Sequence, residues 1–346
     1  MKHFHTLDAL RFYAFFIVFI HHLPISIDSY FSKITKSGGI GVQIFFLLSG
    51  FLITYILFHE KLNKKKFSLK NFMMRRILRI WPLYYAMVFF AFITPTILQV
   101  LSMDSSGDGY APNWLYPLLF LENYQMMLTN SFANVSPLRV MWSLCIEEHF
   151  YIIWGLAFLL LPMKRILNFL IGSIFFSFVS RLIYYKIGLI DMDIFTNIHY
   201  FSFGGILAYV LLFKPEWIEK LAIFSTILKR VIAFFILTLL LFIPNFKLDF
   251  LIIEPLIISL LTILLLALTL PEKNALKISD HNIINRLGKY TYGMYLFHTI
   301  WINLFNKFTN QYLLIALFAF VATILSSILS YHIFEKQFLK LKKYYR

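Results

Sequence analysis

The sequence has little charge and almost no cysteine. Only 14% of its 346 residues are charged, whereas an ordinary globular domain has about 25%. Hydrophobic residues make up 60% of the chain, and the mean hydropathy is +0.73. This composition leaves too few polar side chains to cover a soluble fold, which excludes a soluble enzyme, a disordered chain and a protein with a single membrane anchor. The one cysteine, Cys145, excludes an internal disulfide and a metal site built on cysteines.

Two further sequence signals are missing. No small-residue cleavage site follows the first apolar run, where the residues from Leu23 to Asp28 are unsuited to one, so we interpret this run as a retained span. No internal repeat is visible, although transporters commonly carry repeats across their two halves. The second absence weighs against a transporter.

The long apolar runs predict an all-α, polytopic membrane protein with about ten transmembrane helices in a single bundle. The runs are longer than the ~10-residue strands of a membrane β-barrel and lack their alternation, and a helical span needs ~20 apolar residues. The predicted spans are 9–24, 39–58, 78–99, 141–161, 167–187, 196–213, 225–243, 250–270, 287–306 and 312–334. We expect residues 1–346 to form one integral membrane domain, because the remaining residues leave no room for an appended soluble domain of ~100 residues.

The basic residues are distributed unevenly between the two sides of the predicted bundle. In a soluble protein the net charge of +15 would suggest a nucleic-acid partner, but here we expect none. With the N-terminus placed inside the cell, the inside segments hold 25 of the 32 Lys and Arg residues. The other seven are Lys33, Lys36, Arg139, Arg181, Lys186, Lys247 and Lys307. The positive-inside rule therefore predicts cytoplasmic termini, an even number of spans and an outside connection at 101–139. This orientation places Arg11, Arg76 and Arg79 near the inner face of the membrane, and His22 and Glu147 near the outer face.

The fourth predicted span carries polar residues on one helical face. Ser143, Glu147 and Tyr151 are spaced four residues apart, which places a hydroxyl, a carboxylate and a phenol in a row. An ionisable group at membrane depth indicates a functional site. The neighbouring Glu148 and His149 have an equally good alternative in the wet headgroup zone.

The first predicted span carries Arg11 at its inner end and His22 near its outer end. They are eleven residues apart, about three turns, and so lie on roughly one face. A neutral imidazole is the natural proton acceptor for a hydroxyl nucleophile. Taken singly, His22 could also be an interfacial anchor and Arg11 a positive-inside anchor.

Two more spans carry candidate binding residues. Arg76 and Arg79 open the third span and share a face, and two guanidinium groups form a fork for phosphate. Positive-inside anchoring explains the same pair. In the ninth span Tyr295 and His298 share a face. Arg181 lies inside the fifth span and needs a partner, for which Glu147 and Glu148 are the candidates.

Together these segments resemble the membrane acyltransferase-3 family over nearly the whole chain. The motifs that carry the resemblance are Arg11 with His22, the second-span block from Gly41 to Gly50, Arg76 with Arg79, Ser143 with Glu147 and Tyr151, and the run from Tyr292 to His298. The chain departs from the family at Phe297, where a tryptophan is usual, and at Ala9 and Phe12, where glycines are usual. The glycine departures affect the packing expected of the first span but not its Arg11 and His22.

The resemblance implies an enzyme of the bacterial cell membrane. It moves an acyl group, expected to be acetyl, from cytoplasmic acyl-CoA to a hydroxyl of a cell-envelope polysaccharide or a lipid-linked sugar. The partners are then acyl-CoA, the glycan acceptor and membrane lipids. Neither a metal nor a permanently bound cofactor is expected.

The resemblance and the placement of the residues together suggest roles for them. His22 and Glu147 are the expected catalytic residues, with His22 as the general base on the acceptor hydroxyl and Glu147 orienting it or binding the sugar. The expected acyl-CoA ligands are Arg11, Arg76 and Arg79. The expected acceptor-binding residues are Ser143, Tyr151, Tyr295 and His298.

Two other functions fit parts of the pattern. A glycan transporter or flippase would also have polar groups along a helical bundle, but the sequence shows no repeat. A structural membrane subunit would leave the placement of the His, Glu and Arg residues unexplained. Acyl transfer from acyl-CoA in the absence of glycan transport distinguishes the enzyme from the transporter.

Overall fold

The computed structural model describes residues 4, 6–26, 31–63, 67–103, 108–246 and 248–345. Within these ranges the chain is helical, and its β-type pairing is limited to an isolated bridge between Tyr110 and Ala133. The predicted all-α class is therefore confirmed. Six basic residues of the charge count lie outside the described residues: Lys2, Lys64, Lys65, Lys66, Lys247 and Arg346.

Within the described ranges, seven helices are long and apolar enough to cross a membrane. They are α3 (Gly38–Asn63), α4 (Leu69–Val100), α7 (Trp142–Leu160), α8 (Met163–Ile187), α9 (Ile194–Phe213), α11 (Thr226–Phe242) and α15 (Tyr312–Ser330). Each coincides with a span predicted from the sequence. The protein is thus a polytopic helical membrane protein.

The other three predicted spans are also helices, but they are shorter. They are α1 (Leu7–His21), α12 (Ile253–Ala267) and α14 (Thr291–Asn306), of 15, 15 and 16 residues. A straight helix needs ~20 residues to cross the hydrocarbon region. The count of ten is therefore approximate, while all ten positions are helical.

Short helical pieces connect these long elements. They are α2 (Ser32–Thr35), α5 (Leu115–Leu118), α6 (Glu122–Thr129), η1 (Ser136–Val140), α10 (Pro215–Glu219), η2 (Lys220–Ile223), η3 (Ile243–Asn245), α13 (Ile283–Gly288), η4 (Tyr331–Glu335), α16 (Lys336–Lys340) and η5 (Leu341–Tyr345).

Local sequence explains where several helices begin. The side chain of Ser68 accepts a hydrogen bond from the backbone N–H of Asn71 at the start of α4, and Ser225 does the same for Leu228 at the start of α11. Such caps satisfy N–H groups that have no partner inside the helix. Helix α4 continues through two prolines, which membrane helices tolerate because neighbouring groups satisfy the freed carbonyls.

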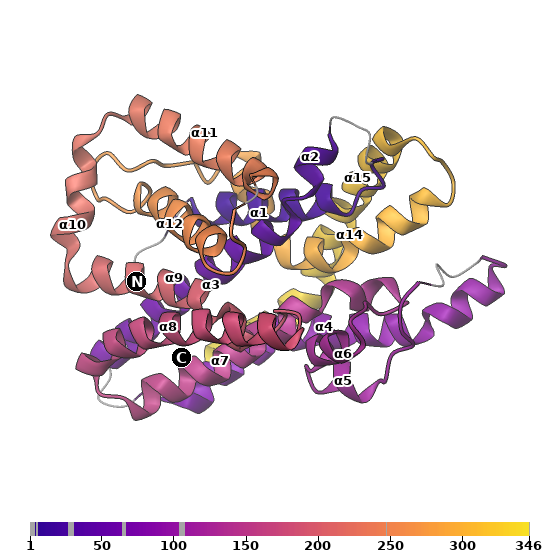
Figure 1. The fold of residues 1–346 in the computed structure, drawn as a ribbon, viewed down its shortest axis with the longest axis horizontal. Helices are drawn as coiled ribbons and strands as arrows, with labels where there is room; N and C mark the ends of the chain where they lie inside the picture. Colours follow the sequence, from indigo (N-terminus) through magenta and orange to yellow (C-terminus); the bar gives the residue numbers. More distant parts are fainter. Residues whose placement is uncertain are drawn as a thin grey trace. The chain divides into compact units, whose positions relative to one another are not determined.

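The chain forms two compact units, each assembled from segments that alternate along the sequence. The first unit comprises Met1–Phe67, Leu160–Val179 and Ile198–Thr291. In it α1 packs on α3 and α13, and α12 packs on α3 and α11. Figure 1 shows α12 with α3 and α11. The N-terminal helix therefore packs both against a helix that follows soon after it and against one from the last quarter of the chain.

Glycines allow close helix contacts in the first unit. A Cβ at Gly41 would lie 2.4 Å from the carbonyl oxygen of Ala14, and one at Gly50 would lie 2.1 Å from that of Phe201. Small residues let membrane helices approach closely. Gly41 and Gly50 therefore serve close helix packing in this unit.

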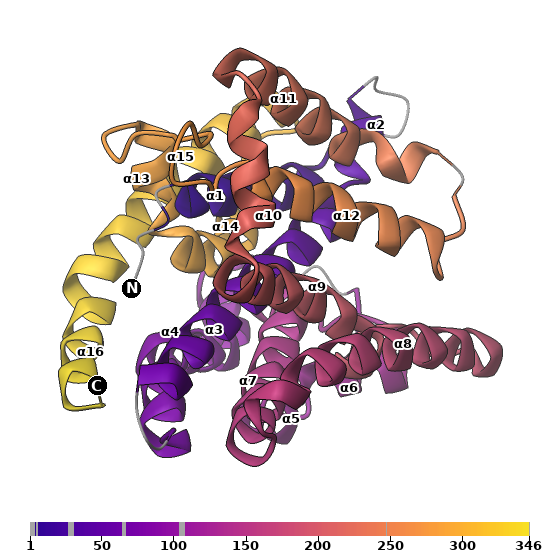
Figure 2. The same cartoon turned by 90° about the vertical axis from the view of Figure 1, so that its left-hand side faces the viewer.

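The second unit comprises Ser68–Leu159, Ser180–Asn197 and Tyr292–Arg346. Helices α4 and α7 run antiparallel in it. A Cβ at Gly155 would lie 2.6 Å from the Leu69 side chain, while at the other end Tyr84 Oη lies 4.0 Å from Cys145 Sγ. The C-terminal pieces η4, α16 and η5 also pack on α4, as Figure 2 shows for α16.

Part of the 101–139 connection folds back onto the second unit, and we call residues 110–135 the cap segment. The Tyr110 N–H donates to the Phe132 carbonyl at 3.0 Å, and the Asn134 N–H donates to the Tyr110 carbonyl at 2.9 Å. Tyr84 Oη donates to the Pro117 carbonyl at 2.8 Å, which ties the cap segment to α4. The apolar patch at 117–121 is thus anchored to a long helix.

Candidate functional site

Helix α7 presents Glu147 and Tyr151 to the N-terminal part of α4. Tyr151 Oη donates to Glu147 Oε1 at 2.5 Å, as expected for side chains one turn apart. The guanidinium carbon of Arg76 lies 5.8 Å from the ring centroids of Tyr151 and Phe72. A cation over an aromatic face is attracted by the ring. Arg76, Tyr151 and Glu147 therefore form one continuous group, although the sequence suggested that Arg76 and Glu147 lie near opposite membrane faces.

The carboxylate of Glu148 belongs to the same α4–α7 contact. Its side chain is 4% exposed, and Trp81 Nε1–H donates to Oε2 at 3.2 Å. Among the described residues, Oε1 has no hydrogen-bond partner. The wet headgroup alternative considered for Glu148 does not hold, because the side chain is buried. The contribution of Trp81 was missed, since nothing in sequence spacing relates it to Glu148.

Helix α14 brings three predicted acceptor-binding residues together. Tyr295 Oη lies 2.7 Å from Ser143 Oγ on α7 and donates to the Val140 carbonyl at 2.9 Å. His298 is buried, and its Nδ1 lies 2.7 Å from the Tyr295 carbonyl. A carbonyl oxygen only accepts, so Nδ1 carries the proton and Nε2 of the neutral ring is the basic nitrogen.

His22 ends α1 in the first unit and has a defined tautomer. Its Nδ1 lies 2.9 Å from the Val18 carbonyl, one turn back. For the reason given for His298, the proton is on Nδ1 and Nε2 is the basic nitrogen. His21 is exposed, and its Nδ1 lies 2.6 Å from the Thr35 carbonyl. The two rings meet edge to face with centroids 4.9 Å apart.

Arg11 is already paired within its own helix. Its Nη1 lies 2.6 Å from Asp8 Oδ1, one turn earlier, and both groups are partly exposed. Arg79 is exposed on α4, one turn beyond Arg76. The structure therefore brings Arg76, Tyr151 and Glu147 together, and it joins Ser143, Tyr295 and His298. The pairing of His22 with Glu147 stays a prediction.

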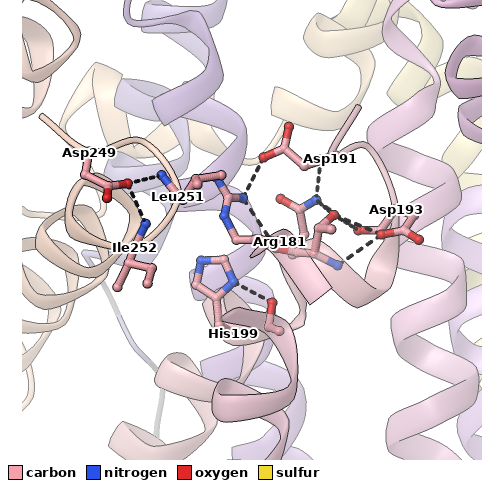
Figure 3. A network of polar contacts seen from close by, with 10 residues as sticks. Arg181, Asp191, Asp193, His199, Asp249, Leu251 and Ile252 are labelled. Carbon is pink, nitrogen blue, oxygen red and sulfur yellow. Dashed lines mark hydrogen bonds and ion pairs between the residues drawn. The ribbon is translucent and has the colours of Figure 1, made fainter. Parts of the chain in front are cut away.

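The partner of Arg181 differs from the expected glutamates. Its Nη1 forms an ion pair with Asp191 Oδ2 at 2.7 Å, and the Arg181 side chain is only 6% exposed (Figure 3). Asp191 lies in the short connection between α8 and α9, where the chain turns back. Helix pairing therefore supplies a carboxylate ten residues away, and the prediction of Glu147 or Glu148 is wrong for this ion pair.

Two other buried polar groups have structural partners. Asp193 Oδ1 accepts from the Thr196 N–H at 3.0 Å, and Asp193 Oδ2 accepts from Tyr184 Oη at 2.6 Å. In the first unit His199 is buried, with its Nδ1 2.9 Å from Ser177 Oγ (Figure 3). These contacts explain both groups as packing elements, and sequence analysis identified neither.

Glu122 in the cap segment is a buried acid that sequence analysis also missed. Its side chain is 0% exposed, and Tyr110 Oη donates to its Oε1 at 2.5 Å. Burial raises the pKa of Glu122 to about 7 and also raises the pKa of Tyr110. Neither the spacing nor the composition of the 101–139 connection indicated this burial.

The sequence is similar to known O-acetyltransferases. The chain is 38% identical over 173 residues to a peptidoglycan O-acetyltransferase of Listeria monocytogenes, covering 48% of this chain and 26% of the relative. It is 29% identical over 329 residues to a provisionally named O-acetyltransferase of Staphylococcus aureus, covering 86% of this chain and 50% of the relative. The chain thus spans half the length or less of these curated relatives.

No solved structure matches the chain. A family model described as an acyltransferase domain matches residues 4–332. The match includes every residue that the motifs singled out. On this match, the chain belongs to the acyltransferase-3 family.

Proposed function

We propose that the protein is a membrane O-acyltransferase that moves an acetyl group from acetyl-CoA to a hydroxyl of a cell-envelope glycan. The observation that carries this proposal is the continuous group of Arg76, Tyr151 and Glu147. It combines a guanidinium suited to a phosphate with a carboxylate and a phenol suited to sugar hydroxyls. A structural subunit would have no use for such a group at membrane depth.

The chemistry follows from the expected roles of His22 and Glu147. Nε2 of His22 takes the proton of the acceptor hydroxyl while the oxygen attacks the thioester carbonyl carbon. The tetrahedral intermediate collapses by cleaving the C–S bond, and the leaving sulfur takes the proton from His22. For Glu147 we propose the role of orienting the imidazole or of binding the sugar hydroxyls.

The proposed acceptor is a polysaccharide or a lipid-linked sugar of the envelope. The Listeria relative is named for peptidoglycan, which makes a wall glycan the first acceptor to test. We place the protein in the bacterial cell membrane with both termini in the cytoplasm, so that acyl-CoA arrives from the side that is rich in basic residues. Acyl-CoA is a consumed donor, and no permanently bound cofactor is proposed.

Labelled donor provides the test. The full chain, purified in detergent, is incubated with radiolabelled acetyl-CoA and cell-wall glycan fragments, and both free CoA and labelled glycan are measured. We expect release of CoA with transfer of label to the glycan. Translocation of unmodified glycan in proteoliposomes, without release of CoA, would instead establish the flippase.

A further inference from the structure

The C-terminal end of the chain packs against the start of α4. After α15 the chain continues as η4, α16 and η5, and each of these contacts α4 (Figure 2). Arg75 Nη1 donates to the Tyr345 carbonyl at 2.6 Å. We call residues 333–345 the tail. The tail lies beyond the family match, which ends at residue 332.

The tail adds a fourth cation to the three arginines of α4. Lys342 is half-buried, and it lies close enough to Arg79, Arg76 and Arg75 for their charges to act on its ammonium group. Arg75, Arg76 and Arg79 occupy one side of a helix. Four positive groups brought together in this way repel one another unless an anion lies among them.

Among the described residues, no carboxylate forms an ion pair with Arg76, Arg79 or Lys342. The negative charges of Glu147 and Glu148 attract Arg76, and the charge of Glu335 attracts Arg79. Hydrogen bonds to these three carboxylates come from Tyr151 to Glu147, from Trp81 to Glu148 and from Ser330 to Glu335. In the described part of the chain Arg76 Nε is buried without a hydrogen-bond partner. N–H donors of these side chains are therefore available to bind an anion that is not part of the protein.

The chemistry of the group matches phosphate. Arginine binds phosphate oxygens through two parallel N–H groups, and lysine adds a compact point charge. A single phosphate engages one or two such side chains, so four cations match an anion with several phosphates. The donor of the proposed reaction has a diphosphate and a 3′-phosphate on one nucleotide.

We propose that Lys342 of the tail completes, with Arg75, Arg76 and Arg79, a site for the phosphate groups of the CoA nucleotide. This inference rests on the proposed function, because it takes acyl-CoA as the donor. The tail is then part of the donor site. The same phosphate chemistry is found in the headgroup of an anionic lipid, and the experiment must distinguish these two sources.

The tail provides a matched control for Lys342. Lys340 is exposed, and its Nζ donates to Gln337 at 3.1 Å. Lys340→Gln therefore removes the same charge from the same segment without removing a cation from the α4 group. Lys342→Arg keeps the charge and the phosphate donors, so it distinguishes loss of binding from misfolding.

The experiment measures the dissociation constant of CoA by isothermal titration with the full chain in phosphatidylcholine nanodiscs. Lys342→Gln should weaken CoA binding about tenfold, since a charge-assisted hydrogen bond is worth ~1.5–3 kcal/mol and 1.4 kcal/mol is tenfold. Lys340→Gln and Lys342→Arg should stay within about threefold of wild type. A larger effect on CoA than on 3′-dephospho-CoA would assign Lys342 to the 3′-phosphate, and an equal effect would assign it to the diphosphate.

Three outcomes count against the inference, and they are distinguishable. If wild type binds CoA and Lys342→Gln matches Lys340→Gln, the role of Lys342 is wrong while the proposed function stands. If Lys342→Gln leaves CoA binding unchanged but reduces retention of phosphatidylglycerol in native mass spectrometry, the anion is a lipid headgroup. If wild type itself binds no CoA, the proposed donor is wrong, and the inference fails with it.

Discussion

At the scale of single residues, neighbouring residues of the same type differ in their exposure and in their hydrogen-bond partners. His21 and His22 are adjacent, yet His21 is exposed while His22 is half-buried with Nδ1 bonded to its own helix. Glu147 accepts from Tyr151, whereas its neighbour Glu148 accepts from Trp81 on another helix. Successive residues on a helix point about 100° apart, so the side chains of two neighbours contact different parts of the protein.

The two histidines give the prediction at this scale. His22→Ala should lower the rate of acetyl transfer by 10²–10⁴-fold, the usual effect of losing a general base. His21→Ala serves as the matched control and should retain most activity. Transfer of label from acetyl-CoA measures both variants, at equal amounts of protein in the membrane. Equal rates for His22→Ala and wild type would show that another group takes the proton.

At the scale of elements, the cap segment shows how a loop can become part of the core. Helix α6 begins at Glu122, and both Glu122 and Asn123 are buried. Asn123 Nδ2 donates to the Met192 carbonyl at 3.0 Å, and Met126, Met127 and Met192 form an apolar cluster. This packing removes the Glu122 carboxyl from water, which is why its pKa is raised.

The stability of the protein should therefore depend on the protonation of Glu122. Its pKa in the folded protein, about 7, lies above its ordinary value of 4.5. Between these values the folded protein holds a proton that the unfolded chain has released, so stability falls as the pH rises through this window. The loss amounts to at most about 3.5 kcal/mol, from about 1.4 kcal/mol for each pKa unit.

Thermal unfolding in detergent measures this effect. Wild type should lose thermal stability between pH 5 and pH 8, and Glu122→Gln, which has no charge to bury, should lose less. Glu216→Gln, a change at an exposed acid of α10, should behave like wild type. If Glu122→Gln and wild type show the same pH dependence, the Glu122 carboxyl is not the group responsible.

At the scale of the whole molecule, the distribution of basic residues predicts the orientation in the membrane. The connection before α4 is expected in the cytoplasm and the cap segment outside. Single cysteines test this orientation, because the native Cys145 is fully buried and can be replaced by serine. Ser68 and Thr129 are exposed positions on the two sides of the predicted arrangement.

A membrane-impermeant thiol reagent added to intact spheroplasts should label Thr129→Cys. Ser68→Cys should react only after lysis. The opposite pattern would reverse the topology and move the proposed CoA entrance to the outer face. Labelling of both from outside would show that α4 does not cross the membrane between them.

Hydropathy and helical spacing were sufficient to predict the class of the protein, the positions of its ten helices and the rows that share a face. Ser143, Glu147 and Tyr151 could be placed together because residues four apart on a helix are neighbours whatever surrounds them. Hydropathy likewise depends on each segment alone. Such local properties are present in the sequence before the chain folds.

Tertiary structure decided which groups meet across helices. Ser143 meets Tyr295 from 152 residues away, Trp81 meets Glu148 from 67, and Arg75 meets the Tyr345 carbonyl from 270. No spacing rule relates such positions, because helix packing selects among many surfaces of similar composition. For the same reason the burial of Glu122, the pairing of Arg181 with Asp191 and the approach of Lys342 to the α4 arginines emerged only once the helices were packed.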